Sequence, residues 1–293
     1  MNFKEKQLYF IKLIEEKLEE SIRIDSPYYP RLKEAMQYSL MAGGKRLRPS
    51  LALATAELFD HDLNDVITYA CSIEMIHTYS LIHDDLPVMD NDDYRRGKLT
   101  NHKVYGDGIA ILAGDGLLTA AFETMLSQTN VEPQVLITVV KEIAAAAGPA
   151  GMVGGQVVDL ESEGKTIDAK TLEFMHQAKT GALFKAALRA GAMLAGANQE
   201  QLRALSCYAD QFGLAFQITD DILDVTGTQE KIGKPVGSDI RNHKVTYVTL
   251  HTLEGANHLA HQAVNSALCN LNDFGPEAET LRQLVNHLIN REA

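Results

Sequence analysis

The sequence lacks a basic excess, and this argues against one broad class of partner. It has 39 aspartate and glutamate residues against 27 lysine and arginine residues, so its formal net charge is −12. Proteins that bind nucleic acid usually present a basic patch or stripe. We therefore expect no nucleic-acid partner.

Cysteines and long apolar runs are also scarce. The three cysteines (Cys71, Cys207 and Cys269) lie far apart without a C-x-x-C spacing, so we expect neither a disulfide framework nor a zinc ribbon. No uninterrupted apolar run reaches about 18 residues, which predicts that no integral membrane segment is present. The N-terminus runs directly into charged, helix-patterned sequence and shows no signal peptide. Together these absences predict a cytoplasmic protein.

Strand signals are missing as well, whereas helical periodicity extends over almost the whole chain. No repeated period-two alternation bounded by Asn-Gly or Asp-Gly turns occurs. Near the start, Ile11, Ile14 and Leu18 recur at helical spacing, and glutamates take the other side. Asn198, with Gln201 three residues later, has the pattern of a capping box at a helix start.

No long Gly, Ser or Pro linker and no short repeat divides the chain. We therefore predict a single domain over residues 1–293. Its fold class is all-α, with roughly ten or more helices, given the usual helix length.

Two aspartate-rich segments stand out from the helical background. They are residues 84–90 (DDLPVMD) and residues 220–224 (DDILD), and each follows an apolar helical run. Aspartate is a poor helix former, so its repetition there costs stability. Asp220 and Asp224 share a helix face at i and i+4, where like charges repel and a cation between them would relieve the repulsion. The alternative is a solvated acidic helix end, which is less convincing for two such segments in one chain.

The chemistry of these segments narrows the choice of cation. Carboxylate oxygens without nearby cysteine favour Mg²⁺, Mn²⁺ or Ca²⁺ over zinc or copper. An EF-hand beginning at Asp90 fails, because Arg95 replaces the required glycine and Asn101 replaces the final glutamate. Mg²⁺ usually takes one or two carboxylates and leaves its other positions to water and phosphate oxygens. The segments therefore predict a phosphorylated ligand held through metal.

Basic residues elsewhere fit such a ligand. Residues 43–49 (GGKRLRP) form a glycine-rich turn, with Pro49 expected at the first position of a helix. Lys45 and Arg48 would then lie near a helix N-terminus, which suits phosphate. The further candidates are Arg95, Arg96, Lys179 and Lys234. Each of these, taken alone, is more often a surface cation than a ligand.

One histidine precedes the first aspartate-rich segment on the same helix face. His77 and Ser80 lie seven and four residues before Asp84, so all three share a face. His77 would then point into the cavity that Asp84 faces. The alternative is that His77 is a core or rim residue, as a lone histidine on an apolar helix usually is.

Several motifs in register resemble one family. Residues 74–87 (EMIHTYSLIHDDLP), followed by Arg95-Arg96-Gly97, closely resemble the first aspartate-rich region of the trans-isoprenyl diphosphate synthases, and most of all the bacterial farnesyl type. The family's other signatures follow in its order: residues 43–49, Gly154-Gly155-Gln156 with Asp159-Leu160, Lys179-Thr180-Gly181, Gln217 with residues 220–224, and Gly233-Lys234 with Gly237, Asp239 and residues 244–247 (KVTY). The resemblance covers roughly residues 30 to 250. One departure is His243, where the family often has glycine.

The resemblance implies a bundle around a central cavity and a head-to-tail prenyl transfer. In that reaction an allylic diphosphate ionises, the cation alkylates isopentenyl diphosphate, and proton loss gives a product five carbons longer. The family pattern implies three Mg²⁺ ions, replaceable by Mn²⁺, on the carboxylates of Asp84, Asp85, Asp90, Asp220, Asp221 and Asp224. It implies that the allylic leaving group is neutralised by Arg95, Lys179 and Lys234. It implies that isopentenyl diphosphate is held by Lys45, Arg48, His77 and Arg96. Thr180 and Gln217 would place oxygen dipoles near the carbocation, and a homodimer is expected.

The same resemblance bears on product length. In the family, bulky residues just before the first aspartate-rich segment form the floor of the hydrocarbon tunnel, and here these positions hold Tyr79 and Ser80. We predict a C15 product, farnesyl diphosphate, with geranylgeranyl diphosphate (C20) as the alternative.

Three other functions remain alternatives. A class I terpene cyclase normally has Asn, Ser and Glu in its second metal motif, unlike residues 220–224. A non-catalytic subunit of a heteromeric synthase tends to lose one aspartate-rich motif, and both are present. A purely structural bundle leaves the ordered cationic motifs unexplained.

Overall fold

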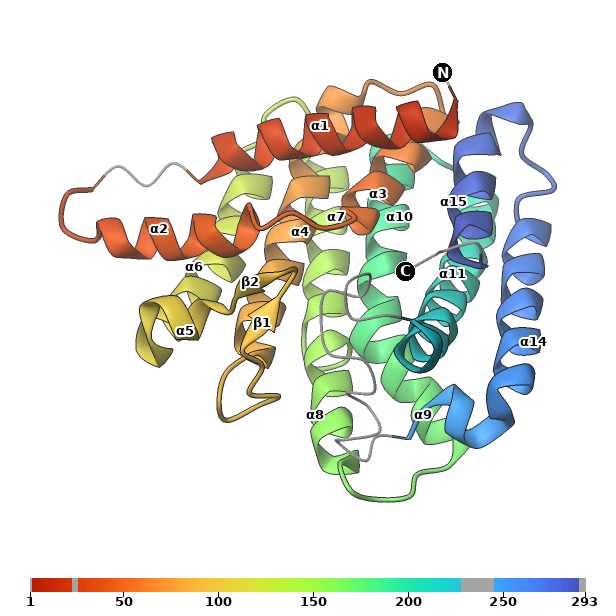
Figure 1. Cartoon of the computed structure of the whole chain (residues 1–293). Helices are drawn as coiled ribbons and strands as arrows, with labels where there is room; N and C mark the ends of the chain where they lie inside the picture. The colour runs from red at the N-terminus through yellow and green to blue at the C-terminus, as the bar shows by residue number, and fades with distance from the viewer. Residues whose placement is uncertain (1, 23–25, 228–244, 290–293) are drawn as a thin grey trace.

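The computed structural model describes residues 2–22, 26–227 and 245–289, and most of these residues are helical (Figure 1). The helices are α1 (Phe3–Ser21), α2 (Pro30–Leu40), α3 (Leu47–Leu58), α4 (Leu63–Asp84), α5 (Asn101–Tyr105), α6 (Asp107–Leu126), α7 (Pro133–Ala147), α8 (Met152–Ser162), α9 (Ala169–His176), α10 (Ala182–Leu194), α11 (Gln199–Thr226), α14 (Tyr247–Cys269) and α15 (Glu279–Ile289). A π-helical turn, η1 (Gln177–Gly181), joins α9 to α10, and a 3₁₀ turn, η2 (Pro276–Ala278), precedes α15. The all-α prediction is confirmed.

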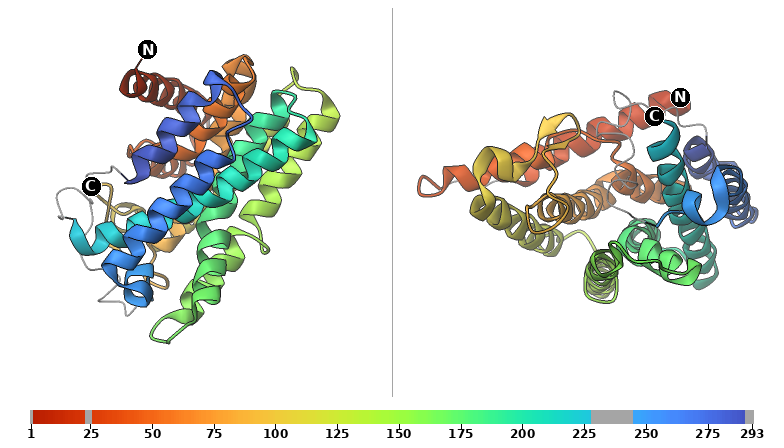
Figure 2. Two further views of the ribbon diagram at one scale, coloured as in Figure 1. Left: turned by 90° about the vertical axis from the view of Figure 1, so that its right-hand side faces the viewer. Right: turned by 60° about the horizontal axis from the view of Figure 1, so that its bottom comes forward.

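The long helices pack side by side into a bundle. Helix α4 packs against α3 and α6, α10 packs against α3 and α7, and α11 packs against α14. Figure 1 shows α1 lying across the bundle, and both panels of Figure 2 show α14 alongside α11. The largest cluster of buried apolar side chains draws on helices from α1 to α15. The single domain over residues 1–293 stays a prediction, which this shared core supports.

Local signals in the sequence explain where several helices begin. The Asn198 side chain accepts hydrogen bonds from the amides of Glu200 and Gln201, and Gln201 bonds back to the Asn198 amide, which is the predicted capping box. In α1 the buried face comprises Phe10, Ile14 and Leu18, as the apolar spacing indicates.

Two local features differ from the sequence prediction. Helix α3 begins at Leu47, so Pro49 occupies the third helical position instead of the first, because Arg46 caps the helix in a left-handed conformation (φ 47°). A short antiparallel hairpin, β1 (Tyr94–Arg95) with β2 (Lys98–Leu99), follows the first aspartate-rich segment. Its turn residues Arg96 and Gly97 both have positive φ. This geometry is usually indicated by Asn-Gly or Asp-Gly, and because arginine stands at the first position here, the sequence did not predict the hairpin.

Two segments are long and apolar enough to cross a membrane by length and composition alone. They are Asp107–Leu126, which is α6, and Pro133–Ser162, which contains α7 and α8. The second segment is interrupted between these helices at residues 148–151. Both are apolar yet mostly unburied in the single chain, which makes their outer faces candidates for contact with another surface.

Candidate active site

The two aspartate-rich segments meet at one polar cavity, although they lie far apart in the sequence. Helix α4 ends at Asp84, and the last turns of α11 carry residues 220–224. Asp84 and Asp90 from the first segment and Asp220 and Asp221 from the second line a cavity of about 230 Å³. The geometry therefore brings four of the six predicted metal ligands together.

The charge on Asp84 is unfavourable in the protein alone. Burial raises the pKa of Asp84 to about 6; nearby Lys179 opposes this rise, and Asp90 adds to it. A cation between these carboxylates would relieve both the burial and the repulsion. The donors are carboxylate oxygens, which fit Mg²⁺. In the part of the chain that the structure describes, no three Asp, Glu, His or Cys side chains already form a compact metal-binding group. The carboxylates that would hold such ions come from separate elements, namely the end of α4 with the segment after it, and α11.

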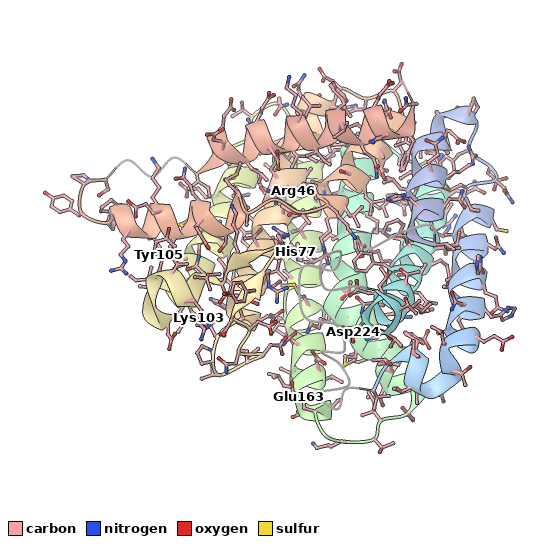
Figure 3. The ribbon with its side chains drawn as sticks, in the orientation of Figure 1. Arg46, His77, Lys103, Tyr105, Glu163 and Asp224 are labelled. Atoms are coloured by element: carbon pink, nitrogen blue, oxygen red, sulfur yellow. The ribbon has the colours of Figure 1, made fainter. Side chains whose placement is uncertain are left out.

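The other two predicted metal ligands lie differently. Asp85, which caps the C-terminus of α4, receives two hydrogen bonds from Arg95 Nε, at 2.7 and 2.9 Å, and an ion pair from Arg95 Nη2. It lines a small cavity of about 30 Å³ beside the hairpin instead of the polar cavity. Asp224 is buried on α11, labelled in Figure 3, and is likewise not among the residues lining the polar cavity. Their metal-binding roles stay predictions.

A second cavity, largely apolar, adjoins the polar one. It has a volume of about 330 Å³ and lies between α4 and α8. The two cavities share four lining residues, namely Leu81, Asp84, Lys179 and Thr180. Tyr79 and Ser80, predicted to set product length, line the apolar cavity on the α4 side. A ligand with a charged head and a hydrocarbon tail could therefore occupy both cavities at once.

The turn η1 presents two further predicted residues at this junction. Lys179 Nζ donates to Asp159 Oδ2 on α8 at 2.6 Å, and Thr180 follows in the same turn. The turn approaches α8 so closely that a Cβ on Gly155 would lie 2.3 Å from the Lys179 amide nitrogen. This contact explains why a glycine stands in the Gly154-Gly155-Gln156 motif. Gln217 on α11, which packs against η1, also lines the polar cavity.

Three of the residues predicted to bind isopentenyl diphosphate lie near α4. Arg48 and His77 line the apolar cavity, and Arg96 lines the small cavity beside the hairpin. The Arg48 guanidinium lies 4.4 Å from the centre of the Phe184 ring. Burial lowers the pKa of Arg48 to about 10, with Glu74 opposing the shift. Burial also lowers the pKa of His77 well below its usual value, and four arginines add to this effect, so this imidazole is neutral near pH 7.

Two predicted phosphate ligands remain apart from this group. Lys45 lies in the exposed turn before α3 and is not among the residues lining the cavities described above. Lys234 lies outside the described residues, as does His243 in the same motif.

Sequence reasoning assigned no role to several residues that the fold brings to the site. Asp159 holds Lys179, and Glu74, buried on α4, contacts the cationic group. His176, whose pKa burial lowers to about 4, lines the polar cavity beside Asp159. The signal for Glu74 was a carboxylate in the apolar middle of a helix, three residues before His77.

Comparison with known proteins places this geometry in a family. The sequence model of the polyprenyl synthetases matches residues 29–287. The chain is 54% identical to the farnesyl diphosphate synthase of Geobacillus stearothermophilus, covering 80% of this chain and 79% of the relative. It is 44% identical to the geranylgeranyl diphosphate synthase of Cyanophora paradoxa, covering 96% and 93% respectively.

Solved structures agree with the sequence relatives. The crystal structure of an FPP/GFPP synthase from Zymomonas mobilis superimposes with a TM-score of 0.88 at 39% identity, covering 98% of this chain and 99% of that one. The structure of a putative farnesyl-diphosphate synthase from Marinomonas sp. MED121 gives a TM-score of 0.86 at 39% identity, with 99% of both chains covered. The fold, the ordered motifs and these relatives together show that the chain belongs to the polyprenyl synthetase family.

Proposed function

We propose that this protein is a prenyltransferase that condenses isopentenyl diphosphate with dimethylallyl and geranyl diphosphates, head to tail, to give farnesyl diphosphate. One observation carries the proposal: a polar cavity lined by carboxylates from two helices adjoins an apolar cavity, and the two share Leu81, Asp84, Lys179 and Thr180. This arrangement suits a substrate that has an anionic leaving group and a hydrocarbon tail. Relatives named farnesyl diphosphate synthase or dimethylallyltranstransferase, at 50 to 54% identity, support the same reaction.

The residues of the polar cavity would act on the leaving diphosphate. Synthases of this family generally depend on Mg²⁺, which supplies Lewis-acid assistance to the departure of diphosphate. Asp84, Asp90, Asp220 and Asp221 would hold the ions, and we propose three per site with Mn²⁺ able to replace them. Lys179, held by Asp159, would neutralise charge as it develops on the departing oxygens. Arg95 lines the same cavity, and Lys234 takes part by resemblance alone.

The apolar cavity would protect and shape the carbocation. Thr180 lines both cavities and Gln217 lines the adjoining polar cavity, and their side-chain oxygens would stabilise positive charge there. The apolar side chains of α8 would exclude water that could capture the cation. We assign no general base on the protein, because the departed diphosphate can accept the proton.

Tyr79 would limit the length of the product. It is buried, lines the apolar cavity and packs edge-on against His83, with ring centres 5.6 Å apart. His83 in turn lies against α6, where a Cβ on Gly114 would come within 2.2 Å of the ring. Helix α6 therefore supports Tyr79 through His83. We propose a C15 product and keep C20 as the alternative, since geranylgeranyl diphosphate synthases are among the relatives.

We also propose that the protein is a homodimer located in the cytoplasm. The large apolar side chains Ile111, Leu112 and Leu126 on α6 and Ile137 on α7 are exposed in the single chain. A second copy would cover such a face, and an exposed apolar patch of this kind commonly marks an interface. The scattered cysteines support a reducing compartment. A mass by light scattering equal to twice the 32.2 kDa chain is expected, and a monomeric mass would contradict the dimer.

The direct test is to analyse the products made by purified protein from dimethylallyl and isopentenyl diphosphates with Mg²⁺. We expect farnesyl diphosphate as the main product and no turnover after chelation with EDTA. A C20 product would select the alternative length. Undiminished turnover in EDTA, or none with Mg²⁺ present, would refute the proposed function.

A further inference from the structure

A buried carboxylate lies among the arginines near the proposed isopentenyl diphosphate site. Glu74 is on α4, one turn before His77, and its side chain is 2% exposed. Its Oε1 atom lies 2.8 Å from Arg46 Nη1 and 3.8 Å from Arg96 Nη2. Glu74 therefore joins one arginine that is sealed in the core to one that lines a cavity.

The first of these arginines, Arg46, has a structural role. Arg46 has no exposed side-chain surface, and its Nη2 donates to the Leu40 carbonyl oxygen at 2.7 Å. It lies in the left-handed region at the N-terminus of α3 and is labelled above His77 in Figure 3. Arg46 is not among the residues lining the three cavities near the site. Arg46 thus fixes the Glu74 carboxylate in place without reaching the substrate.

The second arginine is held from two sides. Arg96 sits in the turn of the hairpin, and its guanidinium lies so close to Gly44 that a Cβ there would be 2.8 Å from Cζ. The Glu74 carboxylate approaches the same guanidinium. The Gly44 backbone excludes one direction of movement, and the charge of Glu74 attracts the guanidinium from another. An arginine side chain that is already restrained loses less entropy when a ligand binds.

The charge balance of this group suits a diphosphate that is bound without metal. Arg46 is paired with Glu74 and is also approached by Glu15 at 3.7 Å, whereas Arg48 and Arg96 line cavities. Two positive charges remain for the substrate. The neighbouring carboxylate Asp85 is bound to Arg95.

We propose that Glu74 is a positioning residue for isopentenyl diphosphate: anchored by Arg46, it holds the Arg96 guanidinium in the orientation that receives the diphosphate. The proposal rests on the proposed function, because it assigns Arg96 to that substrate. Glu74 touches neither substrate itself. Its loss should therefore change the KM for isopentenyl diphosphate and leave the allylic diphosphate unaffected.

The test compares Glu74→Gln with the wild-type protein. Glutamine keeps the shape and one acceptor oxygen but removes the charge. We expect the KM for isopentenyl diphosphate to rise on the order of tenfold, the usual effect of losing an interaction with a charged group, whereas the KM for geranyl diphosphate changes less than about twofold. Glu15→Gln is the matched control, because Glu15 also approaches Arg46, at 3.7 Å, but is 41% exposed. It should leave both KM values unchanged.

A double-mutant cycle separates positioning from a merely structural role. In an Arg96→Ala background, Glu74→Gln should have almost no further effect on the KM for isopentenyl diphosphate. Independent effects that multiply in the double variant would refute action through Arg96.

Glu74→Gln leaves Arg46 buried without its nearest charge partner, so we expect this variant to be less stable. The variant Arg46→Met with Glu74→Gln removes the buried charge together with its partner and carries the test in that case. A raised KM for isopentenyl diphosphate in this folded double variant supports positioning, and a normal KM refutes it. Wild-type protein that shows no turnover would refute the proposed function instead, so the two failures are distinguishable.

Discussion

Two regions beside α4 carry side chains of opposite charge. The polar cavity at the C-terminal end of α4 is lined by Asp84, Asp90, Asp220 and Asp221. About two to three turns earlier on the same helix, Glu74 and His77 lie among arginines. The first region suits a diphosphate that departs and needs metal to stabilise its charge. The second suits a diphosphate that stays intact and can be held directly by guanidinium groups. The contrast shows that one helix can carry two regions of different chemistry, each suited to a diphosphate.

We expect the largest fall in kcat when a carboxylate of the polar cavity is removed. Asp84→Ala and Asp220→Ala should each lower kcat by about 10² to 10³, because each removes a ligand that stabilises charge in the transition state. Steady-state kinetics with Mg²⁺ would measure this. Asp115→Ala is a control, since Asp115 is an exposed carboxylate on α6 that does not line the polar cavity. Near-normal kcat in either active-site variant would overturn the assigned role.

A smaller effect is expected where the backbone positions Lys179 beside the polar cavity. Gly155→Ala places a methyl group against the Lys179 backbone, and we expect a loss of stability of about 1–3 kcal/mol with a lower kcat. Denaturant unfolding and kinetics would measure both. The matched control is Gly108→Ala on α6, where a Cβ meets no atom within 4 Å and alanine favours the helix. Equal stability in the two variants would contradict the close packing of η1 on α8.

Substitutions in the arginine region should change KM for isopentenyl diphosphate and leave kcat largely unchanged. Arg96→Ala should raise the KM for isopentenyl diphosphate on the order of tenfold, because a direct contact with the diphosphate is lost. The KM for the allylic substrate should stay within about twofold. Kinetics with each substrate varied in turn would measure the difference. A change confined to the allylic substrate would reverse the assignment of the two regions.

The smallest effect on rate is expected at the floor of the apolar cavity, where the product changes instead. Tyr79→Ala removes a buried ring from the cavity wall, so the chain should grow towards C20. Product chromatography would show the shift. Tyr28→Ala is the control, because Tyr28 is 91% exposed and lies in the turn before α2. An unchanged C15 profile in Tyr79→Ala would remove Tyr79 from this role.

Much of the site could be predicted because its chemistry is local. Aspartates that follow an apolar run conflict with helix propensity, and this conflict marked both aspartate-rich segments directly. The order of the motifs then indicated the family, which the relatives and the all-α fold confirmed. The capping box at Asn198 was likewise predictable, since it depends on residues three positions apart.

The contacts of the site could not be predicted in the same way. Asp84 and Asp85 are adjacent in the sequence, yet Asp84 faces the polar cavity while Asp85 is bound by Arg95. Nothing in a pair of identical residues distinguishes these roles. The direction in which each carboxylate points depends on where α4 ends and on the hairpin that returns Arg95 to it.

By itself, the sequence determined the helical class, the family and the residue types of both charged regions, because these follow from composition, periodicity and ordered motifs. Tertiary structure alone decided that segments near residues 84 and 220 share a cavity, and that Gly155 meets Lys179. It also decided that Arg46 anchors Glu74. The physical reason is range: propensity and capping act over a few residues, whereas burial, ion pairing and close backbone contact depend on packing between helices far apart in the chain.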